Sequence, residues 1–270
     1  MKARRIVALL ATLPAAALVA GCASATNGNG QVGSGTPSTS VKSPGGGHPT
    51  DAAGLGGLMQ SAISGITSAR FTLAVSTAGL DITGSGSERL SNGKLVAVDV
   101  KESVPGAGEV EIIVTGGKTY AKLPTAAGST GKPWALVTTT SSNPVVRQLA
   151  ATMQQTLSSA SISSYTTFIT AAKSVKYDGQ QPVGGVDTAH YTVVVDVTKL
   201  PDTLPGKDAL IQSGLSDLPI ELYVDAQGRP RQVTENISVQ GQSVQTRFTI
   251  TDYNVPATIT APPPDQVSTG

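Results

Sequence analysis

Two regions of the chain alternate apolar and polar residues in the way that is typical of β-strands. In residues 69–138, apolar side chains occupy every second position in short runs, as at Phe71, Leu73 and Val75. Residues 174–251 repeat this pattern, and turn sequences rich in Gly, Asn and Asp separate the runs in both regions. We therefore predict two antiparallel meanders, the first of about five or six strands and the second of about five.

Helical spacing of apolar residues appears before, between and within the two meanders. Residues 51–68 predict a helix with Asp51 as its N-cap. Asn143-Pro144 starts a second helix, with the asparagine as cap and the proline at the first helical position. Shorter helical segments are expected at 165–172 and at 201–213. The helices are too few to form a layer of their own, so we expect them to cover the sheet.

The number of strands limits the shape of the sheet. A sheet of about ten strands twists too strongly to stay flat, so it must coil or close. We therefore predict an α+β fold, in which a strongly curved antiparallel β half-barrel is covered on its concave face by a few helices.

The first 22 residues predict export and attachment to a membrane. Lys2, Arg4 and Arg5 precede an apolar run that ends in the sequence LVAGC, and Cys22 is the only cysteine of the chain. This layout is typical of a signal peptide, here residues 1–21, followed by a bacterial lipobox. We expect the thiol of Cys22 to receive a diacylglycerol. The paired arginines leave open whether export uses the general or the twin-arginine route.

Composition divides the rest of the chain into three parts. Residues 22–50 combine the lipidated cysteine with a segment rich in Gly, Ser, Thr, Asn and Pro, which predicts a flexible tether. Residues 51–256 contain all the predicted strands and are long enough for one domain with a sizeable core. Residues 257–270 are proline-rich and are expected to form a flexible tail.

Charge and aromatic content argue against several classes of ligand. Charged residues make up 14% of the chain, with 19 Lys and Arg against 18 Asp and Glu. No basic cluster with interleaved aromatic residues is present, so we expect no nucleic-acid partner. Aromatic residues are 4% of the chain, with Trp134 as the only tryptophan, which disfavours a large carbohydrate groove.

The sequence offers no arrangement of residues for catalysis. No phosphate-binding loop, zinc-protease motif or serine nucleophile motif is present. His190 is interpreted as a half-exposed strand residue, and His48 lies alone in the tether. The acidic residues near His190, among them Glu221 and Asp225, are too scattered in sequence to pair. We therefore expect no enzyme activity, no cofactor and no metal site.

The order of these elements resembles the LolA-like lipoproteins of actinobacteria, of the LppX, LprA, LprF and LprG type. The resemblance covers residues 51–256 and includes the hairpin GKTYAKLP at 117–124 with Trp134 after it, and the late hairpin LPIELYVD at 218–225. It implies a half-barrel with an apolar cavity, on a protein that binds and carries or presents acylated lipids or glycolipids. Lipidation of Cys22 would hold this protein at the outer face of the cell membrane, where an envelope transporter or acceptor protein is expected as a further partner.

Strand and helix periodicity select the residues that would line such a cavity. The candidates are the apolar residues expected on the inner sheet face and on the facing helix, namely Leu73, Val98, Val100, Ile112, Val146, Leu149, Met153, Val193, Val195, Leu222, Val224, Phe248 and Ile250. The same pattern fits an ordinary dry core, so the residues alone leave both interpretations open. An envelope sensor or protein-interaction module that transports no lipid is the alternative function.

The lipobox generates a first prediction. Replacing Cys22 with alanine should move the protein from the detergent phase to the aqueous phase in a detergent phase-separation assay. The reason is that stable anchoring requires buried acyl chains, each CH₂ contributing about 0.8 kcal/mol. Unchanged partition of C22A into the detergent phase would contradict lipidation at this residue.

Overall fold

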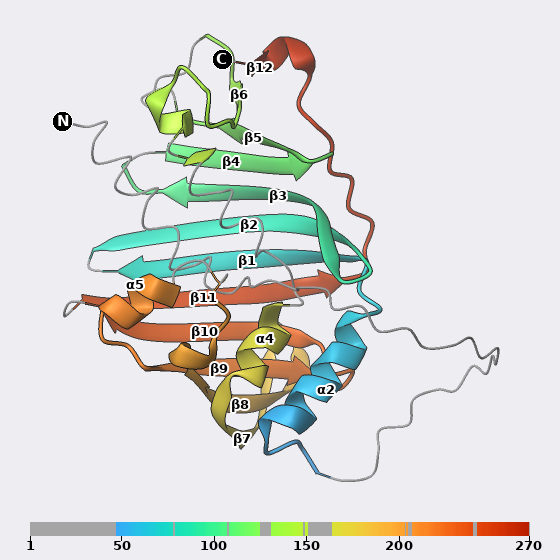
Figure 1. Cartoon of the computed structure of the whole chain (residues 1–270). Coiled ribbons are helices and arrows are strands. Elements are labelled where there is room, and N and C mark those ends of the chain that lie inside the picture. The colour runs from blue at the N-terminus through green and yellow to red at the C-terminus, as the bar shows by residue number, and fades with distance from the viewer. Residues whose placement is uncertain are drawn as a thin grey trace, which may run out of the picture.

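The computed structural model describes residues 47–269, with gaps at 78, 107, 125–130, 148, 151–163, 203, 205–206 and 240–241. The described part forms one 12-stranded sheet in the order β12-β6-β5-β4-β3-β2-β1-β11-β10-β9-β8-β7. The sheet is curved and unclosed, with helices lying over one face of its β7–β11 half (Figure 1). The predicted α+β half-barrel is therefore confirmed.

The first meander follows the sequence prediction closely. Its strands are β1 (Ser68–Thr77), β2 (Leu80–Ser91), β3 (Lys94–Val104), β4 (Gly108–Thr115), β5 (Lys118–Lys122) and β6 (Trp134–Leu136). Each strand pairs antiparallel with the next one in sequence. Gly116 and Gly117 both have positive φ in the turn between β4 and β5, which is why two glycines stand there.

The second meander joins the first through its last strand. Its strands are β7 (Ala172–Val183), β8 (Val186–Asp196), β9 (Asp217–Asp225), β10 (Pro230–Val239) and β11 (Gln242–Tyr253). β11 pairs antiparallel with β1, with Leu73 opposite Phe248. The first strand of one meander and the last strand of the other thus meet near the middle of the sheet.

Two helices begin at the caps that the sequence predicts. The helical elements include α2 (Ala52–Ile63), α4 (Ser164–Thr170), α5 (Lys207–Gln212) and the 3-10 turn η4 (Val197–Lys199), and residues 144–147 are also helical. The carboxylate of Asp51 accepts a hydrogen bond from the Gly54 amide at 2.8 Å, which confirms the predicted N-cap. The side chain of Asn143 likewise accepts from the Val145 amide at 2.9 Å. Within the described ranges, no helix is both long and apolar enough to cross a membrane.

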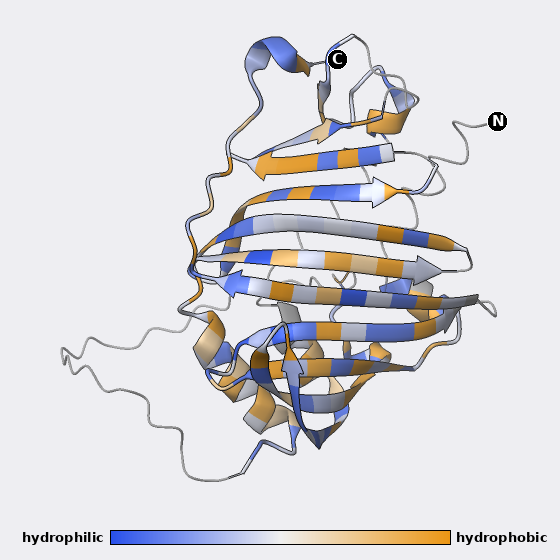
Figure 2. Ribbon diagram, turned by 180° about the vertical axis from the view of Figure 1, so that it is seen from behind, coloured by the Kyte–Doolittle hydropathy of each residue, from blue (hydrophilic) through white to orange (hydrophobic). Residues whose placement is uncertain are grey.

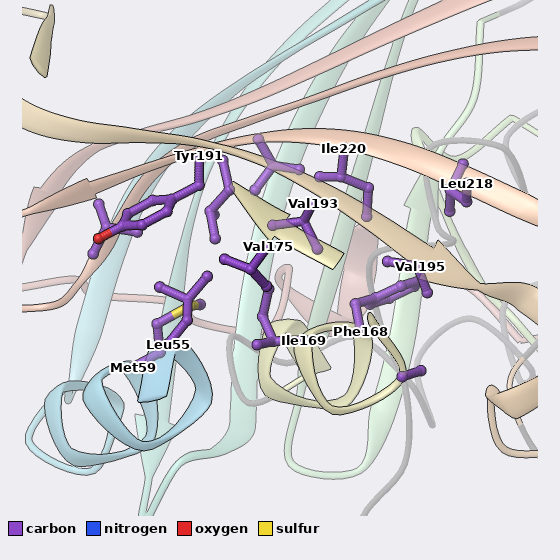
Figure 3. Close-up of a cluster of buried hydrophobic side chains, with 14 of the residues drawn as sticks. Leu55, Met59, Phe168, Ile169, Val175, Tyr191, Val193, Val195, Leu218 and Ile220 are labelled. Atoms are coloured by element: carbon purple, nitrogen blue, oxygen red, sulfur yellow. The ribbon is translucent and has the colours of Figure 1, made fainter. Parts of the chain in front are cut away.

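The largest core cluster lies between the helices and β7–β11. Leu55 and Met59 of α2 and Phe168 of α4 point toward Val193 and Val195 of β8 (Figure 3). These five side chains are at most 2% exposed. The helices therefore seal this half of the concave face with tightly packed apolar contacts.

The C-terminal segment differs from the expected flexible tail. Residues 264–266 form the 3-10 turn η5 (Pro264–Gln266), and β12 (Val267–Ser268) pairs parallel with β6. Ile259 and Val267 are buried against Trp134 and Tyr120. These residues lie against the convex face of the sheet, which is the face opposite α2 and α4 and is turned toward the viewer in Figure 2. The segment supplies the apolar cover that the convex side of β3–β6 would otherwise lack, and β12 pairs with the edge strand β6.

The predicted tether also ends in contact with the sheet. Only its last four residues, 47–50, are among the described residues. The ring of His48 stacks on the ring of Tyr177, with 3.9 Å between centroids. The attachment point of the tether is thus fixed beside β7.

Two glycines lie within a strand of the first meander. Gly84 and Gly86 belong to β2 and point to the concave face. A Cβ on Gly86 would lie 2.6 Å from Cζ of Phe71 and 2.4 Å from the backbone oxygen of Asp99. The glycine is therefore required because the Phe71 ring lies across it, in contact with Phe248 at 4.9 Å between ring centroids.

Gly86 provides a test of this packing. Gly86→Ala should lower the free energy of unfolding by about 1–3 kcal/mol, because the methyl group overlaps backbone as well as the aromatic ring. Gly57→Ala is the matched control, since Gly57 is exposed on α2 and a Cβ there meets nothing within 4 Å. The Gly57→Ala variant should have a free energy of unfolding that is higher than that of the wild type by up to about 1 kcal/mol, because alanine favours the helix. Chemical denaturation of both variants measures the difference, and equal stabilities would contradict the described contact.

Candidate functional site

The candidate site is built on the concave face of the sheet. Strand register places alternate residues of both meanders on this face, in rows that cross the sheet. One such row runs through Tyr191, Leu222, Val233, Phe248 and Leu73, each the Cα partner of the next. An apolar surface contributed by residues far apart in sequence therefore extends across β1 and the second meander.

All the cavity candidates predicted on strands lie on this face. They are Leu73, Val98, Val100, Ile112, Val193, Val195, Leu222, Val224, Phe248 and Ile250. Of the helical candidates, Val146 is buried and Leu149 packs against Val110, Ile112 and Ala121. Met153 lies outside the described residues.

The structure divides these candidates into two environments. Under α2 and α4, Val193, Val195, Leu222 and Val224 are 0–1% exposed and belong to the packed core. Toward the first meander, four candidates are only partly buried, which are Leu73, Val98, Val100 and Phe248. We call these four residues the central floor. On this part of the concave face, the apolar surface is only partly covered.

Three glutamates share the concave face with these apolar residues. Glu88, Glu102 and Glu235 are 8%, 7% and 2% exposed, and each has a carboxylate oxygen without a hydrogen-bond partner among the described residues. Desolvation raises the pKa of Glu88 and of Glu235 to about 7, and that of Glu102 to about 6. These three acids were not among the residues predicted from the sequence, although each occupies a position where its strand otherwise alternates to an apolar residue, as Glu102 does between Val100 and Val104.

The convex face carries a second polar cluster, which joins residues that sequence reasoning kept apart. His190 hydrogen-bonds to Glu221 through Nε2, and its ring stacks on Tyr223 at 4.4 Å between centroids. One ligand atom each from Asp178, His190 and Glu221 lies within 4.8 Å of the others, a spacing that could hold a metal ion. Asp178 is already bound by Lys176 and by the hydroxyl of Thr192. These contacts lower the pKa of Asp178 to about 2.

Comparison with known proteins shows the class of fold. No protein-family model and no curated protein sequence matches the chain. Among solved structures, the Mycobacterium tuberculosis lipoprotein LppX is similar over 77% of this chain and 98% of its own, with a TM-score of 0.52 and 14% identity. The fold is therefore that of the LolA-like lipoproteins, and the resemblance seen in the sequence is confirmed at this level.

Two more distant likenesses accompany this match. LprF from Mycobacterium bovis has a TM-score of 0.47 and 14% identity, covering 78% of this chain and 96% of its own. The Pseudomonas aeruginosa MucA/MucB complex has a TM-score of 0.37 and 15% identity, covering 80% of this chain and 59% of the matched chain. Neither is similar enough to carry an inference about this protein.

The buried glutamates generate a prediction about pH. Because burial raises the pKa of Glu88, Glu102 and Glu235 above the ordinary value of 4.5, the folded chain binds more protons than the unfolded chain between about pH 4.5 and 7. Stability should therefore fall as the pH rises through this window. Thermal melts should give a higher Tm at pH 5 than at pH 8, and Glu235→Gln should reduce the difference.

The acids with lowered pKa values do not obscure this test. The pKa of Asp178, Asp196 and Asp202 lies below the ordinary 3.8, so these groups lose stabilising contacts only at pH values below that. A Tm that rises from pH 5 to pH 8 would contradict the burial of the three glutamates as unpaired acids.

Proposed function

We propose that this protein is a membrane-anchored envelope lipoprotein that binds acylated lipids or glycolipids on its concave face and carries or presents them. The observation that carries the proposal is the central floor, an apolar surface that is only partly buried in a sheet whose other half is sealed by helices. The LolA-like fold supports it, because that fold sets a curved sheet around such a surface.

The chemistry of the central floor suits an alkyl chain. Leu73, Val98 and Val100 present only aliphatic groups, and Phe248 adds an aromatic ring that contacts Phe71. An acyl chain forms no hydrogen bonds, so it gains from burial against groups that need none. Burial contributes roughly 25 cal/mol for each Å² of apolar surface removed from water. The packed half of the concave face then acts as the rigid support on which the floor is held.

The N-terminal region determines where this binding would take place. With Cys22 acylated, the chain would be held at the outer face of the cell membrane. The tether would leave the sheet beside His48, which contacts Tyr177. A lipid bound on the floor could then pass between the membrane and an envelope transporter or acceptor protein within reach of the tether.

Tryptophan substitutions at two valines of the concave face test the proposal. Residues 23–270, which include every described residue, would be purified without detergent, and the lipid that co-purifies would be identified by native mass spectrometry. Val100→Trp should reduce the retained lipid and cost less than about 1 kcal/mol, because Val100 is partly exposed. Val195→Trp should instead cost about 1–3 kcal/mol or more, because Val195 is fully buried.

Ser103→Trp serves as the control for the tryptophan itself. Ser103 lies on the same strand as Val100, on the convex face, and is exposed. The Ser103→Trp variant should retain as much lipid as the wild type and should have the same free energy of unfolding. Absence of any lipid from the wild type, together with equal destabilisation by V100W and V195W, would overturn lipid binding and favour a dry interaction module.

A further inference from the structure

The acids of the concave face differ from the other buried acids of the described chain. Asp225 accepts hydrogen bonds from both Arg229 and Arg231, each at 2.9 Å. Glu111, on the convex face of β4, lies within 4 Å of Lys101 and Lys122. By contrast, no ion pair among the described residues includes a glutamate of the concave face. Burying an unpaired acid costs free energy, so such a group calls for an explanation.

Two of the three glutamates border the central floor. The Cα partner of Val98 on β2 is Glu88, and Glu102 follows Val100 by two residues on β3. A Cβ on Gly84 would lie 3.1 Å from Cγ of Glu102, so the Glu102 side chain lies across the glycine, toward β1. Four residues of strand separate Val98 from Glu102, which spans roughly 13 Å. The floor therefore has one unpaired acid near each end.

Glu235 has a different position. Its Cα partners are Ile220 and Thr246, and it is flanked along β10 by Val233 and Ile237, both of the packed core. It shares burial and the unpartnered oxygen with Glu88 and Glu102, but it lies among core residues and is related to the central floor only through its diagonal position to Phe248. This makes Glu235 a control for the effect of an unpaired acid by itself.

We propose that Glu88 and Glu102 are hydrogen-bonding subsites at the two ends of the lipid site, and that they select an acylated lipid whose polar part carries hydroxyl groups. The inference rests on the proposed function, because it assigns the polar contacts of the same site. It explains why two acids are kept on an otherwise apolar surface, at a cost to the stability of the lipid-free protein.

A hydroxyl group matches these acids better than other polar groups do. It donates a hydrogen bond to a carboxylate and accepts one from a protonated carboxyl group, so it can bind in either state. An ester carbonyl only accepts, and it would therefore pair only with the protonated acid. An ammonium group would have to leave water as a charge and enter apolar surroundings, at a cost of several kcal/mol. With pKa values of about 6 and 7, both acids are divided between the two states near neutral pH.

The test compares two lipids that differ only in their hydroxyl groups. Residues 23–270 would be incubated with equal amounts of 1-monooleoylglycerol and propyl oleate, which share the acyl chain, the ester and the three-carbon alcohol, and the bound ratio would be read by native mass spectrometry. The wild type should prefer monooleoylglycerol about tenfold, as expected for one or two net hydrogen bonds. Glu88→Leu and Glu102→Leu should each lower this preference toward equality, whereas Glu235→Leu should keep it.

Stability of the lipid-free variants provides the second readout. Glu102→Leu and Glu235→Leu should both raise Tm at pH 8, because each removes an unpaired buried acid. Glu111→Leu should lower it, because that acid has two lysine partners. A clear drop in Tm for E102L would assign Glu102 to the fold and overturn its role as a subsite. Should E102L not fold, the preference of E88L decides the question.

The outcomes separate this inference from the proposed function. Equal binding of both lipids by the wild type, or an unchanged preference in both E88L and E102L, would overturn the inference and leave lipid binding standing. Binding of neither lipid would overturn the proposed function itself. A preference lost equally in E235L would show that any buried acid has this effect, and would also overturn the assignment.

Discussion

The pairing of β1 with β11 is the contact on which the rest of the structure depends. It joins two meanders, each of which is built from local hairpins, into one continuous sheet. The partners are far apart in sequence, as Leu73 and Phe248 are, so this pairing has the largest loop-closure cost in the sheet. Only after it forms do the apolar faces of the two meanders become one concave surface.

The helices then divide that surface according to what each one covers. α2 and α4 lie over part of the second meander and bury the concave side of β8, since they bring large side chains such as Leu55, Met59 and Phe168 into the cluster that contains Val193 and Val195. Over the first meander, the described cover includes Leu149, which contacts β4 and β5 through a smaller cluster. A single sheet face thus supplies both a core that stabilises the fold and a surface on which an apolar ligand can be buried.

The polar groups follow the same division between stability and binding. Away from the concave face, the fully buried Asp225 is held by two arginines that also lie over the Tyr253 ring at 4.9 Å, whereas the partly buried Asp99 of the convex face has an oxygen without a partner among the described residues. On the concave face, the acids have no such partners, and burial alone raises their pKa. A domain whose other polar groups are hydrogen-bonded or ion-paired can tolerate a few unpaired buried acids at a ligand site, although each of them lowers the free energy of unfolding.

The sequence by itself determined the local features of this protein, because these depend on neighbours within a few residues. Alternation predicted both meanders and the face of every strand candidate, and the caps at Asp51 and Asn143 began helices as expected. Features set by distant contacts were decided by the tertiary structure. Val100 and Val195 have the same side chain, and strand alternation places both on the concave face. Only Val195 lies in the core formed with α2 and α4.

The same reason accounts for the predictions that were wrong or missing. The sequence could not show why Gly84 and Gly86 stand within a strand, because the Phe71 ring and the Glu102 side chain lie across them only in the folded sheet. The C-terminal segment looked loose because its few apolar residues gain burial only against Trp134 and the convex face of strands about 130 residues earlier. The phase of Glu88 and Glu102 was readable in the strand pattern, but the absence of a partner among the described residues is a property of three dimensions. Sequence periodicity fixes the direction of a side chain, whereas burial and pairing depend on what the folded chain places opposite it.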